Sequence, residues 1–448
     1  MDEKGLFKAH VAHCVQDARA ALKVTGFETL VIHAGIPDFF HADDQAVPFH
    51  SVPHFARFVP VNSPHHFLII SGDAARVVEI IPTHYWEEHG TENEFWKTEY
   101  NVTTIHSEVD GSNPRNSVAA GADGWKEFSH GAKTAFIGDR AATELAHKAG
   151  FHTTSLNPEP LIKLLDKSRS VKTEYEIACI DEANRVASLG HTAVRDVFFN
   201  GGTERDMHYA FLTATRELEA DLPYTSIIAQ GDKASILHYM RKRDTGGGTT
   251  LLIDAGVQYN RYASDISRTY ASTKAHPTFH TLIADLDALQ QGLVMQVMPG
   301  VHFIELHHAS LVGVGDLLYK HGIITIDGES AAASGVARTF YPHGFGHMLG
   351  IQVHCVSHVT DEDMEHPLRE KYPHVRTKLV LRENMVTTIE PGIYFIDMPL
   401  ETAKASEHKD AYNWKLIDEL RPFGGIRIED NVVVRSSGPE NLTRKYLP

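Results

Sequence analysis

A two-domain α+β fold is predicted by the length of the chain and by a change of hydrophobic pattern near residue 170. The 448 residues are more than one ordinary hydrophobic core accommodates. In the first third, short apolar runs alternate with helical patterns, whereas long helical patterns and further strands fill the rest. We therefore expect a smaller α/β domain over residues 1–168 and a larger α+β domain over residues 169–448.

The expected elements of the first domain alternate between strand and helix. Residues 6–26, LFKAHVAHCVQDARAALKVTG, have helical spacing and end at a glycine, which commonly terminates helices. A second helix is expected over residues 141–150, also ending at a glycine. Apolar runs bounded by Gly, Asp and Pro predict strands at residues 29–35, 66–71, 76–81 and 134–139.

The second domain is expected to contain longer helices. Helical patterns cover residues 172–199, 203–220, 277–296 and 302–322. Strands are expected at residues 225–230, 249–259, 267–272, 386–396 and 425–434. Residues 397–420 are interpreted as a polar insertion between the last two strands.

The composition excludes several classes of protein. Hydrophobic content of 42% and charged content of 22% are typical of soluble globular proteins. A formal net charge of −16 without any basic run argues against nucleic-acid binding. No signal peptide is recognised, and the longest apolar runs are far shorter than the ~20 residues that span a bilayer. Three widely spaced cysteines, Cys14, Cys179 and Cys355, predict no disulfide framework and favour a reducing cytoplasm.

Two aspartates lie on a predicted hairpin, LLIDAGVQYNRYASDISRTY, residues 251–270. If residues 260–261 form the turn, Asp254 lies opposite Ser267. Asp265 is then a diagonal neighbour of Asp254 on the same face, about 7–8 Å away at the backbone. Two carboxylates on a largely apolar hairpin repel each other unless a cation lies between them. The alternative is that one aspartate is a turn residue and the other is solvated.

Two glutamates are expected at strand ends. Glu390 precedes Pro391, which disfavours helix at the residue before it, so a strand should end there in a tight turn. In GGIRIEDNVVV, residues 424–434, strand alternation places Arg427 and Glu429 on one side and the isoleucines on the other. Taken singly, an acidic residue at such a position is more often solvated than a ligand.

Three histidines lie in YPHGFGHMLGIQVHC, residues 341–355, but the chain contains 30 histidines, so each one alone carries little information. His343 and His347 have the i, i+4 spacing of a zinc-binding helix. The two glycines between them oppose that helix, at a cost of ~1 kcal/mol each. A loop or irregular strand is therefore expected, in which glycine lets the backbone approach another segment closely. A structural and a functional role for these histidines remain equally open at this point.

The combination of these residues is more informative than each one alone. Two Asp, two Glu and one His near strand ends suit Mn²⁺, Co²⁺, Fe²⁺ or Zn²⁺, and they hold enough carboxylate for two ions. Two metals ~3.5–4 Å apart can share a water, lower its pKa and assist a hydrolytic displacement. The residues are therefore compatible with a dinuclear metal centre that could serve a hydrolytic reaction.

The ordered motifs LLIDAG…ASDISRTY, PHGFGHMLGIQVH, TIEPGIYF and GGIRIEDN resemble those of the pita-bread metallopeptidases, and among them the prolidases, or Xaa-Pro dipeptidases. The resemblance covers essentially the whole chain. It implies a pita-bread (creatinase/aminopeptidase) catalytic domain over residues 169–448 and a creatinase-like α/β domain over residues 1–168. ADLPYTSIIA, ILHY and the insertion before ELRPFGGIRIEDN make the chain similar to bacterial prolidases and organophosphorus acid anhydrolases in particular.

The resemblance assigns a role to each matching residue. The implied ligands of two divalent metal ions, Mn²⁺ first and Co²⁺ or Zn²⁺ as alternatives, are Asp254, Asp265, His347, Glu390 and Glu429. Asp265 and Glu429 would bridge the two ions, and Glu390 would also shuttle a proton. The implied substrate-contacting residues are His343, His354, His238, Tyr224, Arg376 and Arg427. A homodimer is implied as well, in which Asp44 would reach the neighbouring subunit's pocket.

The implied reaction is hydrolysis of Xaa-Pro dipeptides, with no nucleic-acid or membrane partner. A dipeptidase must bind a free carboxylate, and an Arg fork does so bidentately. The tertiary Xaa-Pro amide has no N–H, so contacts to its carbonyl must polarise it. A bridging hydroxide would attack this carbonyl, while Glu390 passes the proton to the proline nitrogen and His354 stabilises the oxyanion. Aminopeptidase P and organophosphorus acid anhydrolase activities are alternatives on the same site, whereas a metal-free binding protein is disfavoured because all five ligands are present.

One position departs from the family pattern. Prolidases commonly have an acidic residue after the third histidine, and this chain has Cys355 there. The loss of that carboxylate could remove a group that orients a site histidine. The interpretation we favour is replacement by a small residue.

Overall fold

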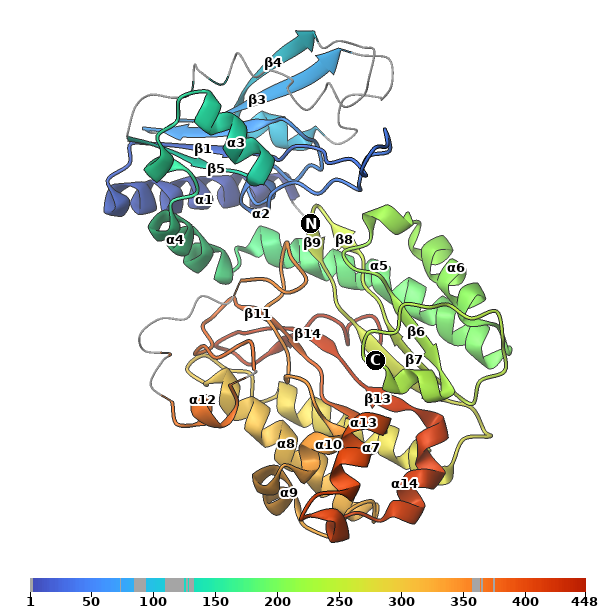
Figure 1. Ribbon diagram of the computed structural model, residues 1–448. Helices are drawn as coiled ribbons and strands as arrows, with labels where there is room; N and C mark the ends of the chain where they lie inside the picture. The colour runs from blue at the N-terminus through green and yellow to red at the C-terminus, as the bar shows by residue number, and fades with distance from the viewer. Residues whose placement is uncertain are drawn as a thin grey trace. The chain divides into compact units, whose positions relative to one another are not determined.

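The computed structural model describes residues 3–72, 74–83, 94–108, 125, 128, 133–356, 363, 366–373 and 375–448 (Figure 1). The chain forms two compact units. The first comprises Met1–Arg169 and Thr173–Tyr175, and the second Ser170–Lys172 and Glu176–Pro448.

The first unit is built on a five-stranded mixed sheet in the order β4-β3-β2-β1-β5. Its strands are β1 (Thr29–His33), β2 (Phe67–Ser71), β3 (Ala74–Thr83), β4 (Asn101–Glu108) and β5 (Thr134–Ile137). Its helices are α1 (Glu3–Thr25), α2 (Pro53–Ala56), α3 (Arg140–Lys148) and α4 (Glu159–Ser170). β1 pairs antiparallel with β2 and parallel with β5, so the sheet is mixed. Apolar side chains of β1, β2, β3, β5 and α3 form the core of this unit.

The second unit contains most of the helices. The helices are α5 (Glu174–Phe199), α6 (Glu204–Thr215), α7 (Pro277–Val294), α8 (Phe303–Lys320), α9 (Gly328–Ser334), α10 (Val336–Phe340), α12 (Leu368–Lys371), α13 (Asp397–Lys404) and α14 (Trp414–Leu420). The strands are β6 (Ile227–Gln230), β7 (Thr250–Asp254), β8 (Gln258–Tyr259), β9 (Tyr262–Ala263), β10 (Ser267–Ala271), β11 (Val386–Ile389), β12 (Gly392–Tyr394), β13 (Gly425–Arg427), β14 (Asp430–Val433) and β15 (Glu440–Asn441).

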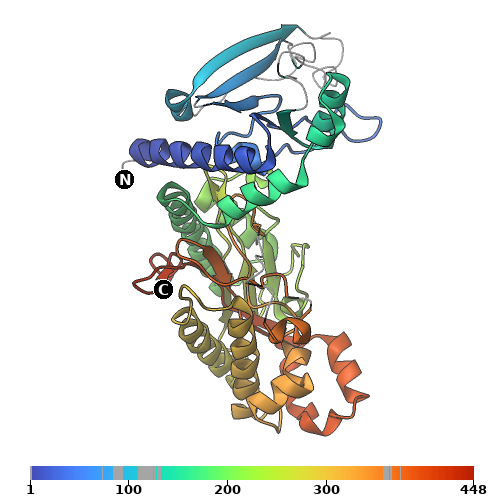
Figure 2. The same cartoon turned by 90° about the vertical axis from the view of Figure 1, so that its left-hand side faces the viewer.

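Short antiparallel sheets lie between two groups of helices in this unit (Figures 1 and 2). The strand orders are β10-β7-β6, β11-β14-β15, β12-β13 and β8-β9. Apolar side chains of α5 and α6 pack with those of β6 and β7 in one core cluster. Those of α7, α8, α9 and α10 pack with β12 and β13 in another. The strands between these clusters carry the acidic residues of interest.

Most of the predicted elements are present. The predicted pairing of Asp254 with Ser267 is confirmed. The helix expected over residues 203–220 ends earlier, at Thr215, because Arg216 adopts a left-handed conformation with φ of 62°. The run 249–259 is two strands, β7 and β8, and the insertion 397–420 contains two helices, α13 and α14.

All three cysteines lie in the described part of the chain, where they are buried and form no disulfide. Among the described residues, no helix combines the length and the apolarity needed to cross a membrane.

Candidate metal centre

The five predicted metal ligands all lie at the ends of strands or beside them. Asp254 ends β7, Asp265 precedes β10, Glu390 follows β11, and Glu429 lies between β13 and β14. His347 lies in an irregular segment that hydrogen-bonds to β11, through its carbonyl to the N–H of Thr388 at 2.9 Å. Strand ends release side chains from the regular pleat, so groups from separate strands can converge on one point.

The hairpin brings Asp254 and Asp265 to the same side. The turn is formed by Asn260 and Arg261, both at positive φ (46° and 73°) as a tight hairpin requires. The hydroxyl of Tyr224 reaches both carboxylates, at 2.9 Å from Asp254 Oδ1 and 2.7 Å from Asp265 Oδ1. The prediction that both carboxylates share a face is therefore confirmed.

The histidine segment is not helical, as its glycines predicted. A Cβ atom at Gly346 would lie 2.0 Å from the carbonyl oxygen of Thr388, so only glycine allows this approach to β11. The Nδ1 of His347 lies 3.1 Å from the Met348 carbonyl, which can only accept a hydrogen bond. Nδ1 therefore carries a proton, which leaves Nε2 as the nitrogen that could bind a metal ion, the arrangement typical of metal-binding histidines.

Three of the predicted ligands offer donor atoms that all lie within 4.8 Å of one another: Asp265, His347 and Glu429. The Nε2 of His347 lies 3.3 Å from Asp265 Oδ2 and 3.7 Å from Glu390 Oε1, which brings Glu390 to the same cluster. These side chains are nearly all buried. The structure thus gathers four predicted ligands directly, and Asp254 joins them through Tyr224.

Arg427 lies against the ligands themselves. Its guanidinium donates to Asp254 Oδ2 at 2.5 Å, to the Tyr394 hydroxyl at 2.8 Å and to Ser267 Oγ at 2.8 Å. The Ser267 hydroxyl in turn donates to Glu429 Oε2 at 2.6 Å. Arg427 therefore orients Asp254 and Glu429, and the structure shows each of its three nitrogens already engaged.

The charges of this cluster are not balanced within the protein. Burial, followed by the charges of Asp265 and Glu390, raises the pKa of Glu429 well above its ordinary value. Burial also raises the pKa of Glu390 to about 7 and that of Asp254 to about 6. Four carboxylates, two buried and two partly exposed, face one arginine and one histidine, so the donor set fits divalent cations, which would remove this repulsion.

The other two histidines of the segment, His343 and His354, differ in exposure and in hydrogen bonding. His343 is held on both sides, with Nδ1 2.8 Å from the Gly344 carbonyl and Nε2 2.9 Å from the Tyr394 hydroxyl. Burial, with Arg427 nearby, lowers its pKa to about 3. His354 is exposed, and its ring lies 4.4 Å from that of His347. Within the described part of the chain, no hydrogen bond holds the His354 ring, so His354 is the imidazole available to a substrate.

The remaining predicted residues are placed as follows. His238 is exposed in a loop after β6, and its charge contributes to the low pKa values of both His343 and His354. Arg376 is exposed and also lowers the pKa of His354, after burial and His347. Asp44 is exposed in the first unit. His238 and Arg376 are thus near the cluster, and Asp44 belongs to a separate unit.

Several residues that hold the ligands in place were not predicted from the sequence. Asn431 clamps the peptide of Asp265, because its side-chain oxygen accepts from Asp265 N at 3.0 Å and its amide donates to the Asp265 carbonyl. Ser267 connects Arg427 with Glu429. Both lie two residues from a predicted ligand in the same strand pattern, so the period-2 alternation could have identified them.

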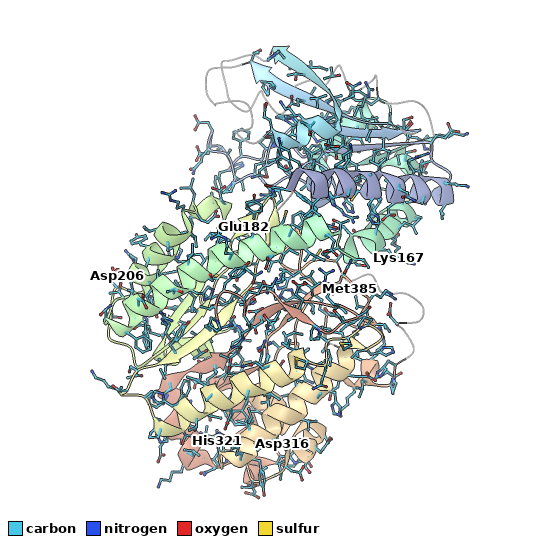
Figure 3. The ribbon with its side chains drawn as sticks, turned by 180° about the vertical axis from the view of Figure 1, so that it is seen from behind. Lys167, Glu182, Asp206, Asp316, His321 and Met385 are labelled. Atoms are coloured by element: carbon cyan, nitrogen blue, oxygen red, sulfur yellow. The ribbon has the colours of Figure 1, made fainter. Side chains whose placement is uncertain are left out.

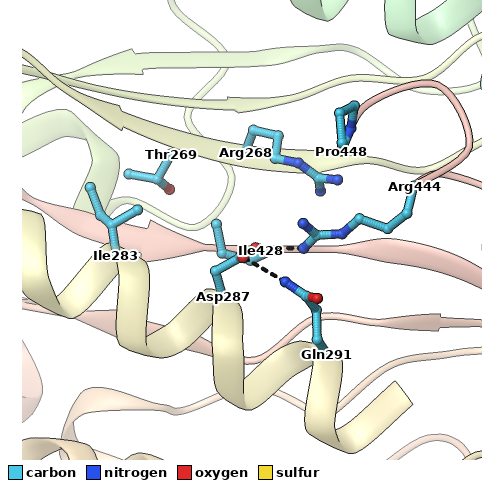
Figure 4. A pocket seen from close by; sticks show the side chains of 8 residues that line it. All are labelled: Arg268, Thr269, Ile283, Asp287, Gln291, Ile428, Arg444 and Pro448. Carbon is cyan, nitrogen blue, oxygen red and sulfur yellow. Dashed lines mark hydrogen bonds and ion pairs between the residues drawn. The ribbon is translucent and has the colours of Figure 1, made fainter. Parts of the chain in front are cut away.

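Behind Glu429, a second group of charged residues lies on the opposite side of the chain. Asp430 accepts from Arg268 at 2.8 Å and from Arg444 at 2.8 Å, and Arg268 also donates to the carbonyl of Glu429 at 2.8 Å. Arg444 pairs with Asp287 of α7 at 2.5 Å. Of these residues, Arg268, Asp287 and Arg444 line a cavity of about 540 Å³ (Figure 4). This network fixes the backbone that carries Glu429.

Cys355 lies in an apolar cluster with Phe345, Met348 and Ile389. Its N–H donates to the Met348 carbonyl at 2.8 Å, and its sulfur borders Gly350 together with Lys172. The surroundings are those of a small core residue, which supports the favoured interpretation.

Comparison with known proteins agrees with this fold and this site. Residues 178–436 match the model of metallopeptidase family M24, and residues 5–166 match that of the Xaa-Pro dipeptidase N-terminal domain. The curated Xaa-Pro dipeptidase of Shewanella woodyi is 36% identical over 447 residues, covering 98% of this chain and 97% of the relative. That of Pseudoalteromonas haloplanktis is 35% identical over 451 residues, covering 99% and 98%.

Solved structures show the same fold. Proline aminopeptidase P II from Yersinia pestis superposes with a TM-score of 0.71 at 23% identity, covering 96% of each chain. The low-pH form of E. coli aminopeptidase P superposes with a TM-score of 0.73 at 20% identity, covering 97% and 95%. The second unit is a pita-bread domain, and the first is a creatinase-like N-terminal domain.

A fold of this kind, with buried carboxylates and one histidine at strand ends, defines a metal-dependent hydrolase. This chain belongs to metallopeptidase family M24 and, within it, to the family of the Xaa-Pro dipeptidases.

Proposed function

We propose that this protein hydrolyses Xaa-Pro dipeptides at a centre of two divalent metal ions. The observation that carries this proposal is the buried cluster of Asp265, His347 and Glu429 donor atoms within 4.8 Å, in a chain similar over nearly its full length to curated Xaa-Pro dipeptidases. Glu390 and Asp254 complete the ligand set.

The donor set favours a hard or borderline cation. Four carboxylates and one imidazole suit Mn²⁺, with Co²⁺ and Zn²⁺ as alternatives. When bound, the ions would supply an activated water at neutral pH and polarise the scissile carbonyl.

The side chains around the ligands divide the remaining work. Glu390 accepts the proton of the attacking water and returns it to the departing proline nitrogen, consistent with its place beside His343 Nδ1 at 3.6 Å and His347 Nε2 at 3.7 Å. His354 donates to the oxygen that becomes negative in the transition state, since its ring is exposed. His343 lines the same site, where its Nε2 is held by the Tyr394 hydroxyl.

The free carboxylate of the dipeptide needs a cationic partner. Arg376 is assigned this role, because it is exposed and its charge acts on His354. Arg427 is assigned to the same side of the substrate, but its engagement with Asp254 gives it mainly an orienting function. Tyr224 and His238 complete the pocket.

We also propose a cytoplasmic homodimer, in which Asp44 of each copy contributes to the neighbouring pocket. The buried cysteines outside any disulfide favour a reducing compartment. Light scattering tests the dimer, and a monomer in solution would refute it.

The experiment that tests the activity starts from chelator-treated protein titrated with Mn²⁺, Co²⁺ or Zn²⁺. Gly-Pro and Leu-Pro are compared with Xaa-Pro-Xaa tripeptides as substrates. We expect metal-dependent cleavage of the dipeptides only. Cleavage of tripeptides but not of dipeptides would instead establish the aminopeptidase P alternative. Hydrolysis of organophosphorus esters is assayed alongside, because the same centre could attack phosphorus.

A further inference from the structure

A buried carboxylate outside the ligand cluster anchors the loop that carries His238. Glu204, the first residue of α6, is fully buried. Its Oε1 accepts from the backbone N–H of Gln230 at 2.9 Å and from Nε and a terminal nitrogen of Arg243 at 3.0 and 2.7 Å. Its Oε2 accepts from the Tyr239 hydroxyl and from the backbone N–H of Arg243, both at 2.8 Å. One side chain therefore binds the start, the middle and the end of the segment 230–243.

Glu204 is itself held in a fixed position. Thr203 and Asp206 form a reciprocal capping box at the start of α6, with Thr203 Oγ1 accepting from the N–H of Asp206 at 3.0 Å (Asp206 is labelled in Figure 3). The carboxylate is thus attached to a rigid helix end, and the loop depends on this helix for its position.

The tip of the loop is packed on one side, where Leu237 lies partly buried against an apolar cluster, and exposed on the other. Ile236 and Met240, on either side of His238, are 47% and 53% exposed. Only Tyr239 between them is buried, in the apolar cluster that also contains Tyr394. Tyr239 and the partly buried Leu237 supply the apolar packing of the tip, and the hydrogen bonds to Glu204 add to this packing in placing the loop.

The loop faces the substrate side of the centre. Tyr394, which belongs to the same apolar cluster as Tyr239, holds Nε2 of His343 through its hydroxyl at 2.9 Å. In addition to burial, which is the larger cause, the charge of His238 lowers the pKa of His343 and that of His354. His238 therefore lies within electrostatic reach of both histidines.

We propose that Glu204 is a positioning residue for substrate binding, because it holds the His238 loop in place through Tyr239 and Arg243. This inference rests on the proposed function, in which His238 contacts the dipeptide. The hydrogen bonds of Glu204 go to the loop and not to the predicted metal ligands. Substituting Glu204 should therefore change KM and leave the affinity for metal unchanged.

The test compares Tyr239→Phe, which removes one hydrogen bond to Glu204, with Tyr412→Phe as a matched control. Tyr412 is equally buried, at 7% against 6% exposure, and its hydroxyl bonds to Thr339 at 2.9 Å. In the metal-loaded enzyme, Tyr239→Phe should raise KM for Leu-Pro about three- to tenfold with kcat within about twofold, and the control should change neither. Glu204→Gln should raise KM further.

A double-mutant cycle shows whether the effect passes through His238. If Tyr239 acts by placing His238, adding Tyr239→Phe to His238→Ala should raise KM no further. Additive effects, or a fall in kcat alone, would overturn the proposal.

Trypsin provides a readout that does not depend on activity. Arg241, Lys242 and Arg243 lie at the end of the loop, so cleavage there should be faster in Tyr239→Phe and Glu204→Gln than in the wild type and in Tyr412→Phe. Unchanged cleavage in both variants would refute the anchoring role. If the wild type cleaved no dipeptide, the proposed function would fail, and this arm alone would still decide whether Glu204 holds the loop.

Discussion

Glu429 and Asp430 are neighbours in sequence and both are buried carboxylates, at 2% and 0% exposure, yet their surroundings are opposite. Glu429 faces Asp265 and Glu390, and burial together with these charges raises its pKa well above the ordinary value. Asp430 faces Arg268 and Arg444, whose charges overcome burial and hold its pKa below the ordinary value. The chain supplies cations on one side of this segment and leaves carboxylates in excess on the other. A buried carboxylate without a cationic side chain bound to it marks a site for an external cation, whereas one paired with arginines is structural.

The largest effect is expected when a ligand carboxylate is removed. Asp265→Ala should lower kcat/KM by at least about a thousandfold, or about 4 kcal/mol of transition-state stabilisation, because the metal centre is lost. Dipeptide hydrolysis and metal content are measured on the same preparation. An active Asp265→Ala variant would show that the carboxylates around Glu429 are not needed for catalysis.

On the side of Asp430, which is paired with two arginines, removing the charge should lower the free energy of unfolding. Asp430→Asn leaves Arg268 and Arg444 without their buried carboxylate, so the free energy of unfolding should fall by about 3–5 kcal/mol. Urea unfolding of the metal-free protein measures this. Asp418→Asn, at an exposed partner of Arg421, is the control and should change stability by at most about 0.5 kcal/mol. If Asp430→Asn and Asp418→Asn lowered the free energy of unfolding equally, Asp430 would not be the structural carboxylate that this comparison makes it.

On the side of Glu429 and Glu390, where carboxylates are in excess, removing a charge should increase the free energy of unfolding. The pKa of Glu390 is raised from 4.5 to about 7, so in the metal-free native state this carboxyl keeps a proton that the unfolded chain has released. It therefore costs stability as the pH rises above 4.5, and the cost is complete above about 7. Metal-free Glu390→Gln should exceed the wild type by up to roughly 3 kcal/mol at pH 8, with the difference vanishing near pH 4.5. A destabilised Glu390→Gln at pH 8 would contradict the proposed charge imbalance.

The smallest effect is expected at Cys355, which lies in the apolar cluster beside the histidine segment. Cys355→Ala should reduce the free energy of unfolding by about 1 kcal/mol through lost packing. Its kcat/KM should stay within about twofold of the wild type, since Cys355 belongs to an apolar cluster and is not one of the predicted ligands. A large fall in activity would instead assign Cys355 an orienting role.

Much of the site could be predicted because its signals are local. The turn at Asn260 and Arg261 and the strand period of two place Asp254 and Asp265 on one face, which needs no information from elsewhere in the chain. Gly344 and Gly346 opposed a helix between His343 and His347 through their local backbone preference, without information from distant residues. The boundaries of α6 were less accessible, since a single left-handed residue, Arg216, ends that helix early.

The amino-acid sequence by itself determined the two-domain α+β class, the hairpin and the set of candidate ligands, because backbone preferences and strand alternation act over a few residues. Only the tertiary structure decided that Arg427 binds Asp254, 173 residues away in the chain, and that Asn431 clamps the Asp265 peptide. It also decided which of two adjacent buried carboxylates is paired and which is not. Burial and the sign of neighbouring charges depend on the convergence of distant strands, and no local pattern encodes them.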